Sequence, residues 1–353
     1  MLSSVRKTKI VASHLHVPPK EHVEEKVLEF YLRMKRQFDP ELTSGALTYD
    51  VRKTIKAVAK RIHDRHEAAA GLQSLKEWHR AQLGALAQDG ARIAGPCSEH
   101  QVDEWAAEVH ARTPWLGEIT AFLMKRMRRQ VRQGRPGLLM PPLLLVGEPG
   151  NGKSWYAEMI GRIAGAPVRE IDVGAGGASF RISGLEKGWG STGPGIPVEM
   201  MLQHKIANPV IVVNEICKAG RRVRSDSGGV ASLTTALLQM LERETAGRFE
   251  CPSFRVSFDL SRVNWVLTAN DLETIPAPLV DRCHVFPMPA VTPDVASVMF
   301  DTVMQSQESD MDPELLDIAR RVVVASARRG HVSLRQIQRV IESTFNAADE
   351  LVH

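Results

Sequence analysis

The chain has 353 residues, of which 43% are apolar, 24% charged and only 5% aromatic. This length predicts about two domains, and this composition can bury a sizeable core, which excludes intrinsic disorder and collagen-like architecture. The sequence has no uncharged apolar run of about 18 residues, and its basic N-terminus lacks the apolar core of a signal peptide. The four cysteines include no C-x-x-C pair, so neither a disulfide framework nor a zinc site is predicted. We therefore expect a cytoplasmic protein without a membrane partner.

The net charge of +4 is unevenly distributed along the chain. Residues 1–140 hold 24 lysines and arginines against 16 acidic residues, whereas residues 141–353 hold 21 against 25. A basic front on a slightly acidic body permits an acidic partner such as nucleic acid. A solvated surface is the more common explanation of such a bias.

The first 112 residues show the periodicity of helices. Apolar residues recur at helical spacing within residues 20–37 and 51–68, and a third helix is expected over residues 74–86. A fourth helix begins after Ser98, where the sequence SEHQ resembles a capping box. We therefore expect residues 1–112 to form an all-helical domain, and no motif in this region predicts a function.

A different pattern follows residue 113. After one helix over residues 115–133, short apolar segments alternate with helical stretches, which is typical of a parallel sheet with crossover helices. The expected strands are Leu143–Val146, Val168–Val173, Val210–Val213, Val263–Thr268 and His284–Phe286. The pattern becomes helical again over residues 294–306, 313–326 and 333–345. We predict an α/β domain over residues 113–290 and a small helical subdomain over residues 291–353.

Residues 147–154, with the sequence GEPGNGKS, match the phosphate-loop motif G-x-x-x-x-G-K-[ST] between a predicted strand and a predicted helix. The glycines let successive N–H groups point at phosphate oxygens, and the following helix adds its positive N-terminal end. Lys153 can reach the β- and γ-phosphates, and the Ser154 hydroxyl can ligate Mg²⁺. We predict that a nucleoside triphosphate is held by Gly147, Glu148, Pro149, Gly150, Asn151, Gly152, Lys153, Ser154 and Trp155.

Polar residues also follow two later strands. Asn214 and Glu215 come directly after Val210–Val213, where P-loop ATPases usually have Asp-Glu. Glu215 is the candidate general base that polarises the attacking water, and a surface carboxylate at a strand end is the alternative. Asn214 is the second candidate metal ligand, although its amide lacks the charge that helps to retain Mg²⁺. Asn270 follows the next strand and can hold the water against the γ-phosphate, with a simple turn as the alternative.

These motifs resemble an AAA+ ATPase, and specifically the ATPase module of the Lon protease family. The resemblance covers roughly residues 115–345 and extends beyond the phosphate loop. It is carried by the segments 182–195 (from ISGLEKGW to PG), 208–218 (NPVIVVNEICK), 231–241 (ASLTTALLQML), 275–282 (IPAPLVDR) and 333–339 (SLRQIQR).

The resemblance implies an AAA+ module, with a five-stranded parallel sheet, flanking helices and a helical lid, that hydrolyses ATP with Mg²⁺ in a homo-oligomeric ring, a hexamer. It implies that Arg282 is an arginine finger for a neighbouring subunit, Asn270 is sensor 1, and Arg335 is the sensor-2 arginine of the lid. It further implies that Trp189 projects into the central pore of the ring. The alternatives are a buried Arg282–Asp281 pair, an ordinary surface helix position for Arg335, and a Trp189 packed beneath its glycine-rich loop.

We therefore expect an ATP-hydrolysing ring motor that threads or remodels a protein client. The sequence ends at His353, just after the lid, so we also expect no proteolytic activity of its own. One alternative is a nucleic-acid-associated AAA+ ATPase, which the basic run between Lys125 and Arg132 suggests. Another is a scaffold that binds ATP but hydrolyses it slowly, which Asn214 suggests.

Overall fold

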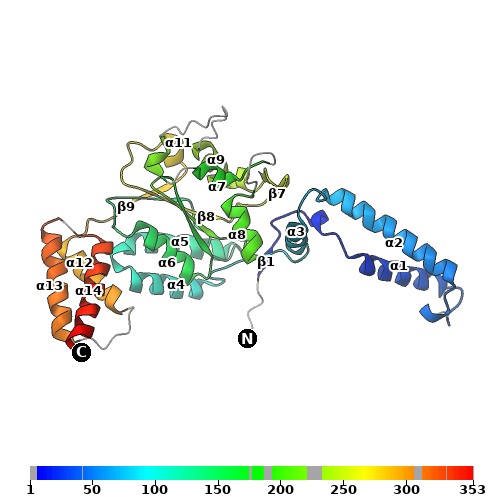
Figure 1. The fold of residues 1–353 in the computed structure, drawn as a ribbon, viewed down its shortest axis with the longest axis horizontal. Coiled ribbons are helices and arrows are strands. Elements are labelled where there is room, and N and C mark those ends of the chain that lie inside the picture. Colours follow the sequence, from blue (N-terminus) through cyan, green and yellow to red (C-terminus); the bar gives the residue numbers. More distant parts are fainter. Residues whose placement is uncertain are drawn as a thin grey trace.

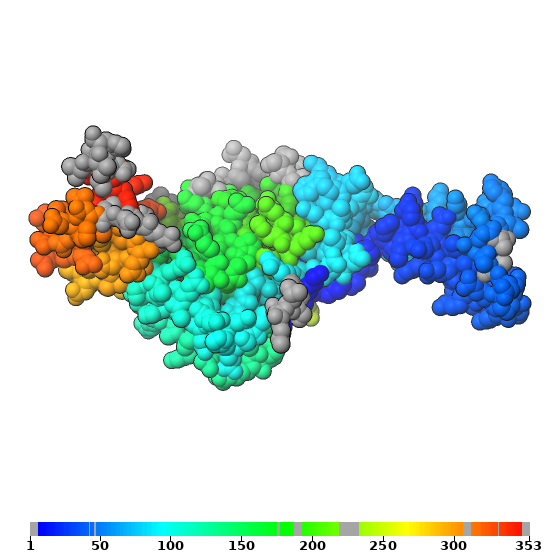
Figure 2. Space-filling view, turned by 90° about the horizontal axis from the view of Figure 1, so that it is seen from below, coloured from blue at the N-terminus to red at the C-terminus, as the bar shows by residue number. Residues whose placement is uncertain are grey.

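The computed structural model describes residues 6–41, 43–174, 177–186, 193–220, 233–305, 312–330 and 332–352. A central α/β domain lies between an N-terminal helical arm at one end of the long axis and a C-terminal helical lid at the other (Figure 1). The space-filling view shows the same elongated arrangement from a perpendicular direction (Figure 2).

The central domain is built on a parallel sheet with the strand order β4-β5-β8-β3-β9. Its strands are β3 (Leu143–Val146), β4 (Val168–Asp172), β5 (Val210–Asn214), β8 (Asn264–Ala269) and β9 (His284–Pro287). The predicted five-stranded parallel sheet is confirmed, and each predicted strand end lies within one residue of the observed end. The central strands could be predicted from their runs of apolar residues, because a strand that is covered on both faces has no polar side to interrupt such a run.

Alternate strand residues enter two different cores. Leu143, Leu145 and Val212 pack with one group of helices, whereas Leu144 and Val213 face the other group. The first group comprises α4 (Glu99–Arg112), α5 (Gly117–Arg132) and α6 (Lys153–Ile163), and the second includes α7 (Ala178–Ser183), α8 (Ile196–His204) and α9 (Leu233–Leu241). Figure 1 shows helices on both faces of the sheet, as parallel strands with helical crossovers require.

Several short elements were not predicted from the sequence. The strands β1 (Lys7–Thr8) and β2 (Ala91–Arg92) form an antiparallel pair, so the region expected to be all-helical also contains a small sheet. The strands β6 (Phe249–Cys251) and β7 (Val256–Phe258) form a hairpin. The one-turn helix α10 (Arg243–Ala246) precedes this hairpin, and the one-turn helix α11 (Ala277–Val280) follows β8. Elements of two to four residues are too short to establish a period in the sequence.

The helices of the first 112 residues divide between two places. The helices α1 (Lys20–Lys35) and α2 (Tyr49–Ala70) form a hairpin that projects from the central domain (Figure 1), and α3 (Glu77–Asp89) buries Leu83 and Leu86 at its base. In contrast, α4 packs on α5 and α6 beside the sheet. The limits of the N-terminal domain therefore stay a proposal.

The C-terminal lid consists of α12 (Pro293–Gln305), α13 (Pro313–Arg328) and α14 (Leu334–Val352) around an apolar core of its own. The backbone N–H of Leu334 donates to the carbonyl oxygen of Gly150 at 2.9 Å, which anchors the start of α14 on the phosphate loop. Within the described ranges, we find no helix with the length and apolar character needed to span a lipid bilayer.

Candidate nucleotide-binding and hydrolysis site

The phosphate loop connects the end of β3 to the start of α6 at the carboxyl edge of the sheet. Gly150 and Gly152 have φ angles of +86° and +82°, a left-handed conformation that residues with a Cβ rarely adopt. A Cβ on Gly150 would also lie only 2.5 Å from Cβ of Ser333 in the lid. The motif glycines are thus required both by the curl of the loop and by the approach of the lid.

The Lys153 side chain lies across the mouth of this loop. Its Nζ donates to the carbonyl oxygens of Gly147 (2.6 Å) and Glu148 (2.8 Å) and lies 3.5 Å from Oδ1 of Asn270. Lys153 is only 9% exposed, and this burial lowers the pKa of its ammonium group. A poorly hydrated cation at the N-terminus of a helix can bind an anion such as a phosphate group.

Asn214 and Ser154 contact each other across the site. Oδ1 of Asn214 accepts hydrogen bonds from Ser154 Oγ (2.7 Å) and from Thr268 Oγ1 (3.2 Å), and its Nδ2 donates to Glu170 Oε2 (2.7 Å). The hydroxyl of Ser154 and the amide oxygen of Asn214, both predicted metal ligands, therefore lie together. Sequence reasoning missed Thr268 and Glu170, which reach Asn214 from the two neighbouring strands of the sheet.

Glu215 occupies a special backbone position at the end of β5. Its φ angle is +59°, and its N–H donates to Oγ1 of Thr268 at 3.2 Å. The carboxylate pairs with Lys218 one turn later, and this hydrogen bond raises the pKa of the lysine. A non-glycine residue in the left-handed region costs about 1–2 kcal/mol, so the surrounding contacts hold Glu215 in an unfavourable conformation that directs its side chain to the cavity.

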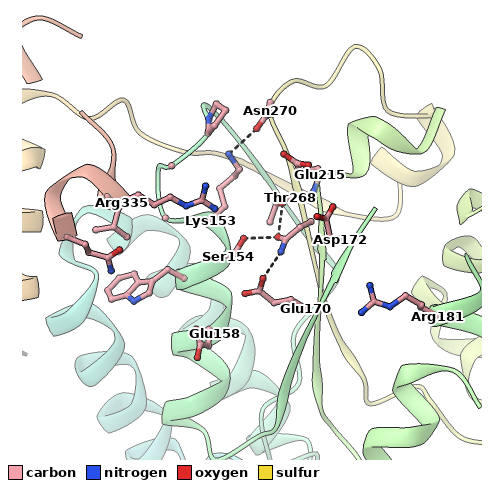
Figure 3. A pocket seen from close by; sticks show the side chains of 17 residues that line it. Lys153, Ser154, Glu158, Glu170, Asp172, Arg181, Glu215, Thr268, Asn270 and Arg335 are labelled. Atoms are coloured by element: carbon pink, nitrogen blue, oxygen red, sulfur yellow. Dashed lines mark hydrogen bonds between the residues drawn. The ribbon is translucent and has the colours of Figure 1, made fainter. Parts of the chain in front are cut away.

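These residues surround one cavity of about 710 Å³, within the range of about 300–1,000 Å³ typical of small-molecule sites. Figure 3 shows Lys153 and Ser154 on one side, Glu215 and Asp172 on another, and Arg335 approaching from the lid. The lining residues are Pro149, Gly150, Gly152, Lys153, Ser154, Trp155, Glu158, Glu170, Asp172, Arg181, Asn214, Glu215, Thr268, Asn270, Leu334, Arg335 and Gln338.

The cavity brings together most of the predicted site residues and adds others. The predictions did not include Glu158, Glu170, Asp172, Arg181, Thr268, Leu334 and Gln338. The sequence VREID of β4 carried a usable signal, because two acidic residues at alternate positions lie on one face of a strand. Gly147, Glu148 and Asn151 belong to the loop but do not line this cavity.

Arg282 and Trp189 were also predicted as site residues. Arg282 follows α11, outside the cavity lining, and its Nε lies 3.3 Å from Oε2 of Glu242. Its partner is thus Glu242 rather than Asp281, and the guanidinium is partly exposed. Trp189 lies outside the described residues, so its expected position in a pore stays a prediction.

The chemistry of the site fits a nucleoside triphosphate with Mg²⁺. The hydroxyl of Ser154 and the amide oxygen of Asn214 are hard oxygen donors, the type that Mg²⁺ prefers. Lys153 and the N-terminus of α6 supply positive charge for phosphates. The parallel sheet, the glycine loop after β3 and the helix that follows together define a P-loop nucleotide-binding fold.

Comparison with known proteins places this fold in a narrower group. Residues 143–288 match the model of the ATPase family associated with various cellular activities (AAA), so the central domain is an AAA domain. The chain is 30% identical over 217 residues to a Lon protease of Syntrophus aciditrophicus (strain SB), a match that covers 60% of this chain and 27% of that protein.

Two further Lon proteins show a similar relationship. The identity is 34% over 164 residues with the peroxisomal Lon protease homolog 2 of Oryza sativa subsp. japonica, covering 46% of this chain and 18% of that protein. It is 35% over 162 residues with Lon protease 2 of Bdellovibrio bacteriovorus (strain ATCC 15356 / DSM 50701 / NCIMB 9529 / HD100), covering 46% and 20%. The predicted resemblance to a Lon-like AAA+ module is confirmed, and the chain spans about a quarter or less of the length of these relatives.

Proposed function

We propose that this protein is an ATP-hydrolysing AAA+ motor that assembles into a homo-oligomeric ring and remodels a protein client. The observation that carries the proposal is the convergence of Lys153, Ser154, Asn214, Glu215 and Asn270 around one cavity at the carboxyl edge of the sheet. In open parallel sheets with helices on both faces, ligands generally bind at this edge.

Binding of ATP would use groups from both the α/β domain and the lid. Backbone N–H groups of the phosphate loop and the ammonium of Lys153 would contact the phosphates, and Arg335 would approach them from the lid. To do so, Lys153 exchanges the carbonyl oxygens of Gly147 and Glu148 for phosphate oxygens. When bound near Ser154 and Asn214, Mg²⁺ would neutralise charge on the β- and γ-phosphates.

Hydrolysis requires a base and a group that orients water. Glu215 would accept the proton of the attacking water, a role worth about 10²–10⁴ in rate. Its carboxylate is paired with Lys218, so we infer that it exchanges this partner for the water in the catalytic state. Asn270 lines the cavity beside Lys153 and would hold the water in line with the γ-phosphate.

Completion of the site would need a second copy of the chain. Arg282 lies outside the cavity of its own chain and is partly exposed, as a group that acts on a neighbour's nucleotide must be. A guanidinium supplied in this way raises phosphoryl-transfer rates by about 10³–10⁵. The similarity to Lon proteins supports a ring, and a hexamer is the size we expect.

Remodelling of a protein client would be the work that ATP hydrolysis drives. It is supported by the AAA domain and by the similarity to Lon proteases, and it assigns Trp189 to gripping an extended polypeptide. The absence of proteolytic activity and a cytoplasmic location stay predictions. The alternative of a nucleic-acid-binding protein loses part of its support, because two arginines of the basic helix α5 pair with acidic residues of α4: Arg128 with Glu99 and Asp103, and Arg132 with Glu99.

The decisive experiment measures steady-state ATP hydrolysis and the unfolding of a fluorescent model client by the same preparation. We expect both activities in the unaltered chain, neither in Lys153→Ala, and hydrolysis without unfolding in Trp189→Ala. Full client unfolding by Trp189→Ala would contradict threading. Hydrolysis by the unaltered chain no faster than by Glu215→Gln would instead favour the slow-hydrolysing scaffold, and salt-sensitive binding of DNA or RNA would favour the nucleic-acid alternative.

A further inference from the structure

Asn214 uses both ends of its side-chain amide. Its Oδ1 accepts hydrogen bonds from the hydroxyls of Ser154 (2.7 Å) and Thr268 (3.2 Å), and its Nδ2 donates to Oε2 of Glu170 (2.7 Å). Two hydroxyl donors on one side and a carboxylate on the other determine the orientation of the amide, because only its oxygen accepts and only its nitrogen donates. Position 214 is thus matched to an amide and not to an acid.

The register between β4 and β5 brings the carboxylate to this place. The strands pair in parallel, with Asp172 opposite Asn214 and Glu170 opposite Val212. Residues two apart on a strand share one face of the sheet, so Glu170 and Asp172 project to the same side as Asn214. Since β4 is an edge strand, both carboxylates remain exposed to solvent.

An aspartate at position 214 would be unfavourable beside this carboxylate. One of its oxygens would replace Nδ2 and face Oε2 of Glu170 at hydrogen-bond distance. Two carboxylates in contact repel each other, which would destabilise this arrangement. The observed pair of Asn214 and Glu170 avoids this repulsion. It places one carboxylate near Ser154, and this carboxylate belongs to β4 rather than to β5.

We propose that Glu170 supplies the carboxylate of the Mg²⁺ site and that Asn214 holds it in position. This inference rests on the proposed ATP-binding function. A carboxylate lining the same cavity as Ser154 would attract the dication and accept hydrogen bonds from its bound water. Asn214 then positions Glu170 through Nδ2 in addition to presenting its own amide oxygen beside Ser154, and its lack of charge does not by itself imply slow hydrolysis.

The test is a Mg²⁺ titration of the full chain with a fluorescent ATP analogue bound, together with Mn²⁺ binding followed by electron paramagnetic resonance. We expect Glu170→Gln to weaken the metal affinity by about 10- to 100-fold, the range known for second-sphere carboxylates. A glutamine keeps an acceptor oxygen for Nδ2 of Asn214, so this loss reports the missing charge and not a lost hydrogen bond. Glu170→Asp, which retains the charge, should lose less.

Two further variants make the result specific. Asn214→Asp combined with Glu170→Gln moves the charge to β5 and should restore most of the metal affinity of the unaltered chain. Neither substitution alone should reach that affinity. Glu158→Gln removes a charge from the same cavity, but Glu158 pairs with Arg162, so this variant should change the affinity far less.

The possible outcomes separate the two proposals. An unchanged metal affinity in Glu170→Gln, with the analogue still bound and the chain folded by circular dichroism, would overturn the role of Glu170. Equal losses in Glu170→Gln and Glu158→Gln would also overturn it, because the effect would then be general to the cavity. A failure of the unaltered chain to bind the analogue with Mg²⁺ would instead overturn the proposed function itself.

Discussion

The indole rings of Trp115 and Trp155 are stacked, with centroids 6.0 Å apart and planes inclined by 10°. Trp115 lies in the short helix η3 (Pro114–Leu116) before α5, and Trp155 lies in the first turn of α6, directly after Ser154. Both rings also pack against the apolar core of the lid. The stack therefore connects the phosphate-loop helix to the lid through a third segment of the chain.

This stack should stabilise the joint between the α/β domain and the lid. We expect a coupling energy of about 0.5–1.5 kcal/mol between the two rings, the range measured for aromatic pairs beyond their buried area. A double-mutant cycle with Trp115→Leu, Trp155→Leu and both substitutions, followed by urea unfolding, measures this energy. If the two single effects simply add, the rings are neighbours without a specific interaction.

Much of the sheet could be predicted because the signals were local. Val210–Val213 is an unbroken apolar run, and the glycines of residues 147–154 are spaced as the phosphate loop requires. The helices of the lid were likewise visible in their apolar periodicity. In these segments the residue pattern of a single element is sufficient to predict that element, and knowledge of the tertiary structure is not needed.

Contacts that depend on the pairing of distant elements could not be predicted. The contact of Glu170 with Asn214 follows from the register of β4 on β5, and that of Leu334 with Gly150 follows from the docking of the lid. The packing of α4 on α5 and α6 also belongs to this class, because an amphipathic helix does not reveal which surface it covers. The site was therefore predicted in outline, but without Glu170 and Asp172, the acidic residues of the predicted strand β4.

Glu215 should be essential for turnover and dispensable for binding. We expect Glu215→Gln to lower the rate of ATP hydrolysis by about 10²–10⁴, because the amide cannot accept the proton of the attacking water. The affinity for ATP should change little, because the contacts of the phosphate loop are retained. Phosphate release and nucleotide binding measure the two effects separately. Glu244→Gln, an exposed position on α10, is the matched control and should leave both unchanged.

The ion pairs between α4 and α5 predict a loss of stability in acid. Hydrogen bonds from Arg132 and then Arg128 lower the pKa of Glu99 from 4.5 to about 2. A depressed carboxyl pKa contributes stability above the ordinary value of 4.5, and the contribution disappears as the pH falls through about 2. Urea unfolding should show Glu99→Gln to be less stable than the unaltered chain at neutral pH, with the difference shrinking below the ordinary pKa. A difference that is independent of pH would contradict the ionic origin.

Arg282 should act on the nucleotide of a neighbouring copy. Its position outside the cavity of its own chain makes Arg282→Ala a variant that keeps an intact phosphate loop, whereas Lys153→Ala keeps an intact arginine. We expect each variant alone to hydrolyse ATP at least about 10³-fold more slowly than the unaltered chain. This factor is the lower limit of the rate effect that an arginine finger has on phosphoryl transfer.

Mixing these two variants distinguishes action in trans from action in cis. In a mixed ring, the phosphate loop of an Arg282→Ala subunit meets the arginine of a Lys153→Ala neighbour, so some interfaces hold a complete site and hydrolysis returns. If Arg282 instead served the nucleotide of its own chain, every subunit of the mixture would lack one essential group and no activity would return. Subunit exchange is verified independently by energy transfer between labelled chains, so that a silent mixture of exchanged rings counts directly against the trans arrangement.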